Sequence, residues 1–465
     1  MNVVFVGGGS YRTLPVVRSG LADNQALRGG EIRLVDFNLP RVETVARLIM
    51  KAPEYAGSEC KISWTAELDE ALPGADVVSV SFPVGSPAVC RLSDQACAAR
   101  GFFGSDQISL SGSFRSVTGG TVLLSIARRM EKHCPRAWLV DFANPVAVYS
   151  GLVNNHTRVR ALGICGGFTN HRWDLTRLLF DKDEYCDEFK VACAGINHLS
   201  FILRGTYRGK DIYAMLGERL ERKGWKPCRT PKFPRMEKHI RYGLARLAEM
   251  YRRFGRIIFS TEGDGMMHIF FEQMRERMFR SYRPATRSQI ERWARGLPAA
   301  RERRDLEFRG YLKKELDGCK EFWAQGPLEN PDFAANPADA TVVVLKALGG
   351  SPQWLAASLP SHGAVSGFKN RTVLEYSMYL DQNGVHPEPG LSVPDCFQGL
   401  ISALATHQTL LGDAIATRDP KTFAAALFAY PLHQNTRQAK ALWRDLLRIH
   451  AREMPKEFQK ARDYF

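Results

Sequence analysis

Asn2-Val-Val-Phe-Val-Gly-Gly-Gly-Ser10, at the start of the chain, is the stretch that decides the fold. An apolar, mostly β-branched run leads directly into three glycines, and a helical pattern follows. This order predicts a buried strand, a tight turn and a helix N-terminus, where bare backbone N–H groups can approach a pyrophosphate. Gly7, Gly9 and Ser10 are therefore predicted to contact a dinucleotide cofactor.

The second predicted strand, residues 31–36, ends in an acidic side chain. Asp36 stands 27 positions after Gly9, near the place where a carboxylate holds the ribose hydroxyls of NAD and disfavours the 2′-phosphate of NADP. We therefore predict NAD as the cofactor and Asp36 as one of its contacts. The sequence differs at one position from the usual dinucleotide-binding pattern Gly-x-Gly-x-x-Gly, because Arg12 stands where the third glycine is expected.

Short apolar strands alternate with helical segments of crossover length over the first third of the chain, which is typical of a doubly wound parallel sheet. After Cys165 the patterns become mostly helical. We predict an α/β fold, with a Rossmann domain over residues 1–190 and a mainly helical α+β domain over residues 191–465. The six parallel strands are expected at 2–6, 31–36, 62–66, 76–82, 138–142 and 161–165, later strands at 190–194 and 200–207, helices at 240–253, 287–297, 394–418 and 435–465, and loops at 326–337 and 349–367.

The chain has 64 Lys and Arg against 49 Asp and Glu, and this formal charge of +15 favours an anionic small-molecule partner. The basic residues at 275–314 stand among acidic and aromatic side chains at helical spacing, which is typical of solvated helix faces rather than nucleic-acid binding. No apolar stretch reaches the ~18 residues of a membrane span. No signal-peptide pattern and no Cys-x-x-Cys is present, so we expect a reduced, cytoplasmic protein.

Several motifs follow one another along the chain: Val4-Phe-Val-Gly-Gly-Gly-Ser10, Ala143-Asn-Pro145, Leu162-Gly-Ile-Cys165, Gly195-Ile-Asn-His198, Leu359-Pro-Ser-His-Gly-Ala-Val365, Gly384-Val-His-Pro387 and Tyr430-Pro-Leu432. In this order they resemble glycoside hydrolase family 4, the NAD-dependent glycosidases. The family implies catalysis by transient oxidation of the sugar at C3, deprotonation at C2, elimination of the leaving group, addition of water and re-reduction. The NAD-dependent sulfoquinovosidases are similar relatives, whose anionic substrate would suit this basic chain.

The resemblance implies that Cys165 and His198 hold a divalent metal, Mn(II) in the family. A thiolate and an imidazole can bind such an ion and leave positions open for two sugar oxygens. The alternative for this pair is a buried structural cysteine beside a hydrogen-bonded histidine. Two departures affect the metal and the sugar preference: Gly166 follows the cysteine where the family has histidine, and Ser111-Gly-Ser-Phe114 replaces the family's Gly-Gln-Glu-Thr run.

The remaining site candidates are polar side chains near these motifs. Asn144 and Asn197 can orient sugar hydroxyls through their amides, and Asn144 is also a candidate for the cofactor site; turn formation is their alternative role. His171 and Arg172 can meet an anionic substituent, or can simply begin a surface helix.

Acid and base candidates come from two stretches. The run Phe259-Ser-Thr-Glu-Gly-Asp-Gly-Met-Met-His268 resembles a Pro-Thr-Glu-Ser-Ser-Glu-His run of α-galactosidase-like family members, which makes Glu262, Asp264 and His268 acid/base candidates. An exposed turn is the alternative. Tyr242 is a second base candidate, because the family can use tyrosine there, although a tyrosine on an amphipathic helix is commonly a core residue.

These patterns favour an NAD-dependent glycosidase that cleaves an anionic glycoside, namely a sulfoquinovoside, a 6-phosphoglycoside or a uronide. The alternative is an NAD-dependent sugar or hydroxy-acid dehydrogenase, which would use the same sheet and accumulate NADH. A third hypothesis is a nucleotide-sensing or nucleic-acid-binding regulator that has lost the chemistry. By analogy with the family, we expect a homo-oligomer.

Overall fold

The computed structural model describes residues 1–465 except 11, 24–26, 83–84, 86, 233, 235, 260–262, most of 275–337, and 432–435. Most of the predicted helix at 287–297 and most of the predicted loop at 326–337 lie outside the described residues. Among those described, no helix is both long enough and apolar enough to cross a membrane.

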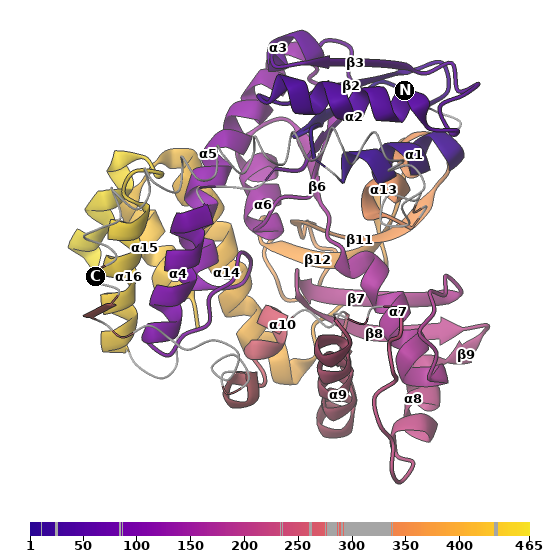
Figure 1. Cartoon of the computed structure of the whole chain (residues 1–465). Coiled ribbons are helices and arrows are strands. Elements are labelled where there is room, and N and C mark those ends of the chain that lie inside the picture. Colours follow the sequence, from indigo (N-terminus) through magenta and orange to yellow (C-terminus); the bar gives the residue numbers. More distant parts are fainter. Residues whose placement is uncertain are drawn as a thin grey trace.

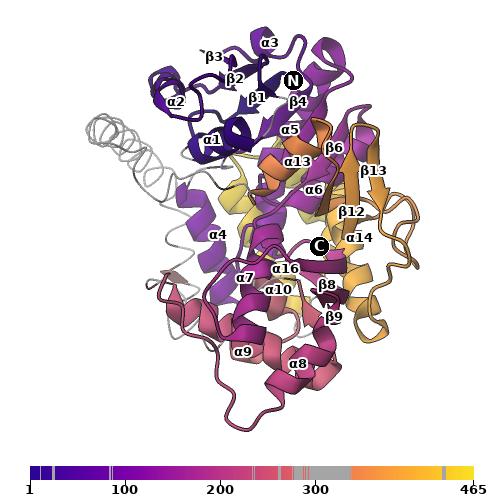
Figure 2. The same cartoon turned by 90° about the vertical axis from the view of Figure 1, so that its right-hand side faces the viewer.

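The N-terminal part is the predicted doubly wound parallel sheet (Figure 1 and Figure 2). Its strands follow the order β3-β2-β1-β4-β5-β6, and β1 lies in the middle with Val3 paired to Ile32 on one side and to Val77 on the other. All six strand predictions are confirmed to within two residues at either end. The strands are β1 (Val3–Val6), β2 (Glu31–Val35), β3 (Lys61–Thr65), β4 (Val77–Val80), β5 (Trp138–Asp141) and β6 (Arg160–Gly163).

Helices cover this sheet, and several begin at side-chain caps that the sequence supplies. Asn38 accepts a hydrogen bond from the backbone N–H of Arg41 at the start of α2, and Ser109 accepts one from Gly112 at the start of α5. The helices of this part are α1 (Thr13–Asp23), α2 (Leu39–Lys51), α3 (Leu68–Ala71), α4 (Pro87–Ala99), α5 (Leu110–His133), α6 (Val146–His156) and α7 (Gly167–Phe180).

The sheet continues past β6 into antiparallel strands, so the two predicted domains share one sheet. The order runs β6-β11-β12-β7-β8-β10, with β13 on β12 and β9 on β8, which makes 13 strands in the described part of the chain. The strands of this half are β7 (Phe189–Ile196), β8 (Leu199–Tyr207), β9 (Lys210–Asp211), β10 (Ile257–Ile258), β11 (Gln353–Pro360), β12 (Val373–Asp381) and β13 (Gly384–Pro387).

The predicted loop at 349–367 is wrong over residues 353–360, because the strand β11 lies inside it. Glycines and prolines bracket this strand, but its residues from Leu355 to Pro360 are buried. The strand bridges the two halves, since Ser358 pairs with Gly163 of β6 while all eight residues of β11 pair with β12. The glycines and prolines at the ends of a buried strand were thus mistaken for a continuous loop.

The C-terminal helices pack against the N-terminal half as well as against each other. Figure 1 shows α14, α15 and α16 gathered beside α4 and α5, and α14 also contacts α6. The predictions at 240–253 and 394–418 are confirmed as α9 and α14. The helices are α8 (Ile212–Leu220), α9 (Glu237–Phe254), α10 (Gly263–Met267), α13 (Ala340–Leu348), α14 (Asp395–Thr417), α15 (Pro420–Ala429), α16 (Thr436–His450) and a 3-10 helix (Lys456–Tyr464).

Candidate functional site

The two predicted metal ligands meet at the carboxyl edge of the parallel strands. Cys165 follows the end of β6, and His198 stands in the turn between β7 and β8. The sulfur of Cys165 lies 3.4 Å from Nε2 of His198. The fold therefore joins two residues that are 33 positions apart in the sequence.

A crowded turn fixes the position of His198. Its backbone has a φ of +69°, which residues other than glycine rarely adopt. The short helix α10 packs directly on this turn, because a Cβ atom on Gly265 would lie 1.7 Å from the carbonyl oxygen of His198. Glycine at 265 lets α10 approach closely enough for Asp264 to reach the imidazole.

Asp264 holds His198 from the side opposite the cysteine. Its Oδ1 lies 2.7 Å from His198 Nδ1, and its Oδ2 accepts hydrogen bonds from Ser105 Oγ and from the backbone N–H of Ile108. Burial alone would raise the pKa of Asp264, but the charge of His198 and these hydrogen bonds hold it below its usual value. Burial likewise opposes the charged form of His198, yet Asp264 and Cys165 raise the pKa of the imidazole well above its usual value.

This arrangement fits a divalent metal. With its Nδ1 proton donated to Asp264, the imidazole of His198 can offer Nε2 as a ligand toward the same space as the sulfur of Cys165. A carboxylate behind a ligating histidine is the usual support of a metal site. No group of three or more His, Cys, Asp or Glu is gathered for a metal in the described residues. A metal held by two protein ligands would have coordination positions open for substrate oxygens.

A chain of amides and carboxylates runs alongside this pair. The Nε2 of Gln107 donates to the side-chain oxygens of both Asn144 and Asn197, Asn144 donates to Asp106, and Asn197 donates to Glu375 over 2.6 Å. Glu375, on β12, is buried and also accepts from Ser200 Oγ. These hydrogen bonds therefore connect the two predicted asparagines, Asn144 and Asn197, and set the orientation of their side-chain amides.

Sequence reasoning missed Ser105, Asp106, Gln107 and Glu375. The first three stand in the loop before α5, and the polar Ser-Asp-Gln run between Gly104 and an N-capped helix was the available signal. The segment Ser111–Phe114 that drew attention instead is buried in the first turns of α5, where Ser113 Oγ lies 2.8 Å from His407 Nε2. Nothing local marks Glu375, because only strand pairing brings β12 to the site.

The predicted cofactor loop follows β1 at the same edge of the sheet. Gly7 has a φ of +86°, and a Cβ there would lie 2.2 Å from the carbonyl oxygen of Ser81. The backbone N–H of Ser10 closes the turn on Gly7, and α1 begins at Thr13. Oδ2 of Asp36 accepts a hydrogen bond from the N–H of Gly9 over 3.1 Å. This bare turn before a helix, with a carboxylate at the end of β2, fits a dinucleotide.

The acid and base candidates surround α10. Glu262 lies outside the described residues. Nε2 of His268 lies 3.3 Å from the carbonyl oxygen of Ile108, the residue whose N–H binds Asp264. The hydroxyl of Tyr242, on α9, is buried. Its ring and that of Phe270, just after α10, both lie against the guanidinium of Arg246, so α9 flanks the α10 segment.

His171 and Arg172 lie on α7 behind the cysteine, in an aromatic cluster. His171 is fully buried and stacks on Phe259 with ring centroids 4.3 Å apart; burial lowers its pKa to about 3. Arg172 donates to the hydroxyl of Tyr185 and lies over the rings of Phe168, Tyr185 and Trp354. The structure therefore does not bring the His171 ring to an open surface, and aromatic side chains surround Arg172.

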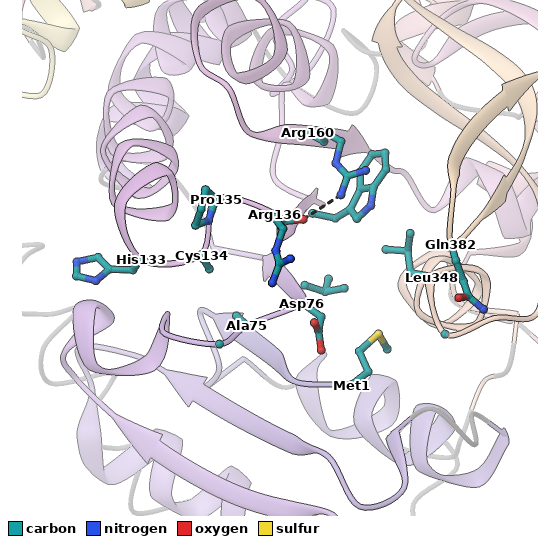
Figure 3. A pocket seen from close by; sticks show the side chains of 14 residues that line it. Met1, Ala75, Asp76, His133, Cys134, Pro135, Arg136, Arg160, Leu348 and Gln382 are labelled. Atoms are coloured by element: carbon teal, nitrogen blue, oxygen red, sulfur yellow. Dashed lines mark hydrogen bonds between the residues drawn. The ribbon is translucent and has the colours of Figure 1, made fainter.

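A pocket of about 630 Å³ lies at the opposite edge of the sheet, near the amino ends of β4, β5 and β6 (Figure 3). Asp76, Arg136, Trp138 and Arg160 line it, and the guanidinium of Arg160 lies 4.4 Å from the ring centroid of Trp138. None of the predicted site residues lines this pocket, so it is separate from the cysteine–histidine pair.

Comparison with known proteins agrees with this architecture. The chain is 23% identical over 461 residues to a 6-phospho-beta-glucosidase of Escherichia coli K12 (98% of this chain, 96% of that protein), and 23% identical over 439 residues to an alpha-galacturonidase of Thermoanaerobacter italicus (90% and 89%). The fold is similar to a 6-phospho-alpha-glucosidase from gut microorganisms, solved in complex with NAD and Mn²⁺, with a TM-score of 0.77 at 16% identity (98% and 99% covered).

Family models cover nearly the whole chain. Residues 2–180 match the model of family 4 glycosyl hydrolases, and residues 193–433 match the model of the C-terminal domain of that family. Together the two matches span the Gly-rich loop, the cysteine–histidine pair, Asp264 and Glu375. The chain belongs to family 4 of the glycosyl hydrolases.

Proposed function

We propose that this protein is an NAD- and metal-dependent glycosidase that cleaves the glycosidic bond of an anionic sugar. One observation carries the proposal: the Cys165–His198–Asp264 arrangement stands at the same sheet edge as a bare glycine turn and Asp36. A dinucleotide held at that turn extends toward the carboxyl ends of β5 and β6, where the cysteine lies. Relatives solved with NAD and Mn²⁺ support the same pair of cofactors.

The residues of the site have separate tasks in this proposal. When bound, NAD accepts and returns the hydride of the sugar carbon C3, and the divalent ion draws electron density from the sugar oxygens. Cys165 and His198 hold the ion, while Asp264 orients the imidazole and stays ionised. Asn144 and Asn197, with their amides set by Gln107, orient the sugar hydroxyls. Oxidation at C3 acidifies the C2 hydrogen, so that a base can remove it and the leaving group can depart.

Proton transfer needs a base at C2 and an acid at the leaving group. Asp264 is better suited to positioning than to proton transfer, because its pKa is lowered and both of its oxygens are engaged. Tyr242 and His268 remain proposals for the base and the acid, together with Glu262. We add Asp106 to them, since its carboxylate is exposed and accepts a hydrogen bond from Asn144.

The substrate proposed is a 6-phosphoglycoside or a glycoside of a uronic acid. Relatives named for 6-phosphoglucosides and for galacturonides support an anionic sugar, and the formal charge of +15 favours one. A sulfoquinovoside is the third member of this class. The described cysteines are free thiols, which supports a reducing compartment such as the cytoplasm.

The test is release of nitrophenol from a panel of aryl glycosides by protein freed of bound nucleotide. Neutral α and β sugars, 6-phosphosugars, uronides and sulfoquinovoside are compared with and without NAD and Mn(II), while absorbance of NADH is followed. Release that requires NAD but leaves no net NADH supports the proposal. Accumulation of NADH without nitrophenol contradicts it and indicates a dehydrogenase.

A further inference from the structure

Arg12 occupies the position of the missing third glycine, and its guanidinium is firmly anchored. Nη2 donates to both carboxylate oxygens of Asp339 at 2.8 Å and to Thr341 Oγ1 at 3.0 Å. The guanidinium carbon lies 3.6 Å from the ring centroid of Phe142. Asp339 is itself fixed, because it caps α13 through the N–H of Thr341. The arginine therefore links the glycine turn to the N-terminus of α13.

This anchoring uses only one of the three nitrogens of the guanidinium. In the part of the chain that the structure describes, Nε and Nη1 of Arg12 have no hydrogen-bond acceptor, and the side chain is 21% exposed. A cation whose pose is set by Asp339 and Phe142, but whose remaining donors are unused, is pre-organised for an oxyanion.

The location of Arg12 indicates where such an oxyanion would lie. Phe142 follows β5, two residues before Asn144, and Thr169, four residues after Cys165, donates to the carbonyl oxygen of Ala338, next to Asp339. Arg12 thus lies between the glycine turn, where a pyrophosphate is expected, and the cysteine–histidine pair, where the sugar is expected.

We propose that Arg12 binds a phosphoryl oxyanion through one of its unused donors, Nε or Nη1. Two sources can supply this group: the pyrophosphate of the dinucleotide, or the phosphate on C6 of the sugar. The second source rests on the proposed function, whereas the first requires only that the glycine turn binds a dinucleotide. A fixed positive charge with a free N–H donor suits either group.

The experiment is calorimetric binding, without turnover, to Arg12→Gln, Arg12→Lys and Asp339→Asn. The probes are NAD, glucose 6-phosphate and, as its uncharged control, glucose. Arg47→Gln is the matched control, because Arg47 is an exposed arginine on α2 that pairs with Glu43. Asp339→Asn keeps an acceptor for the N–H of Thr341, so α13 stays capped while the anchor of Arg12 is weakened.

A loss of about 10- to 100-fold in affinity for NAD in Arg12→Gln assigns the pyrophosphate, and the same loss for glucose 6-phosphate alone assigns the sugar phosphate. Arg12→Lys, which keeps the charge but not the positions of the guanidinium N–H donors, is expected to lose less. Unchanged affinity for both phosphorylated probes in folded Arg12→Gln and Arg12→Lys overturns the proposal. Thermal melting checks folding. None of the probes is hydrolysed in this experiment. The binding of NAD by Arg12 can therefore be tested even if the protein proves not to be a glycosidase.

Discussion

The imidazole of His198 lies between two side chains, with Asp264 2.7 Å from Nδ1 and the sulfur of Cys165 3.4 Å from Nε2. The three residues come from three elements: Asp264 from α10, His198 from the β7–β8 turn, and Cys165 from the end of β6. One ring nitrogen is therefore bound to a buried carboxylate, while the other points toward a thiol at the edge where sheets of this kind bind ligands.

The first prediction concerns the carboxylate behind the histidine. Asp264→Asn is expected to weaken Mn(II) affinity about 10- to 100-fold, because the ligating imidazole loses its charged orienting partner. Titration of Mn(II) followed by electron paramagnetic resonance measures this affinity. Asp413→Asn is the matched control, since Asp413 Oδ1 lies 2.7 Å from His156 Nε2 in a pair that includes no site residue. Equal Mn(II) affinity in Asp264→Asn and wild type would contradict the positioning role.

The second prediction concerns the ligands themselves. Cys165→Ser and His198→Ala are each expected to abolish stoichiometric Mn(II) binding, since each variant lacks one of the two proposed protein ligands. Metal content after dialysis is measured beside turnover. Cys396→Ser serves as the control, because Cys396 is an exposed free thiol at the start of α14. If both variants keep metal and turnover, the metal proposal is wrong.

The third prediction concerns the ribose contact. Asp36→Ala is expected to weaken NAD binding by about 10-fold and to reduce the preference for NAD over NADP. The reason is that the carboxylate that would accept hydrogen bonds from the ribose hydroxyls is lost. Quenching of protein fluorescence by each dinucleotide gives the two affinities. Asp69→Ala, a half-exposed carboxylate on α3, controls for a general change in charge. An unchanged ratio of NAD to NADP affinity would remove Asp36 from the site.

The fourth prediction concerns Asp106. Asp106→Asn keeps a side-chain oxygen for Asn144 but cannot exchange a proton, so kcat is expected to fall by about 100-fold or more, with little change in NAD affinity. The pH profile of kcat should lose one limb. A proportional loss of NAD affinity and kcat would instead assign Asp106 to binding.

The fifth prediction concerns stability against pH. Burial lowers the pKa of His407 to about 4, and Nδ1 is held by the carbonyl of Ala426. Between pH 6.5 and 4 the unfolded chain binds a proton at this residue that the folded chain does not, so this residue lowers the free energy of unfolding as the pH falls. His407→Gln is expected to reduce the pH slope of that free energy by up to about 1.4 kcal/mol per pH unit.

The measurement is denaturant unfolding of wild type and variant at several pH values in this window. The raised pKa of His198 acts in the opposite sense in both proteins and cancels from the comparison. His362→Asn, at an exposed histidine whose positive φ asparagine tolerates, is the control. Parallel slopes for wild type and His407→Gln would show that His407 does not titrate differently on folding.

Local sequence was enough for the parallel sheet and for part of the site. A strand, a glycine turn and a helix are decided within a few residues, so the regions around Gly7 and Asp36 followed from composition and order. Resemblance to the family singled out Cys165 and His198, which the fold brings within 3.4 Å of each other. The segment around β11 was mistaken for a loop, because its role depends on pairing with β6 and β12 rather than on its own punctuation.

The sequence by itself determined the elements and the chemical types available: thiol, imidazole, carboxylate and amide. Only the tertiary structure decided which of them act together. It places Asp264 behind His198, connects Asn144 to Glu375 through Gln107, and buries His171 against Phe259. The reason is physical: helix and strand formation respond to neighbours along the chain, whereas a hydrogen bond between β12 and the β7–β8 turn depends on how distant strands are ordered in the sheet.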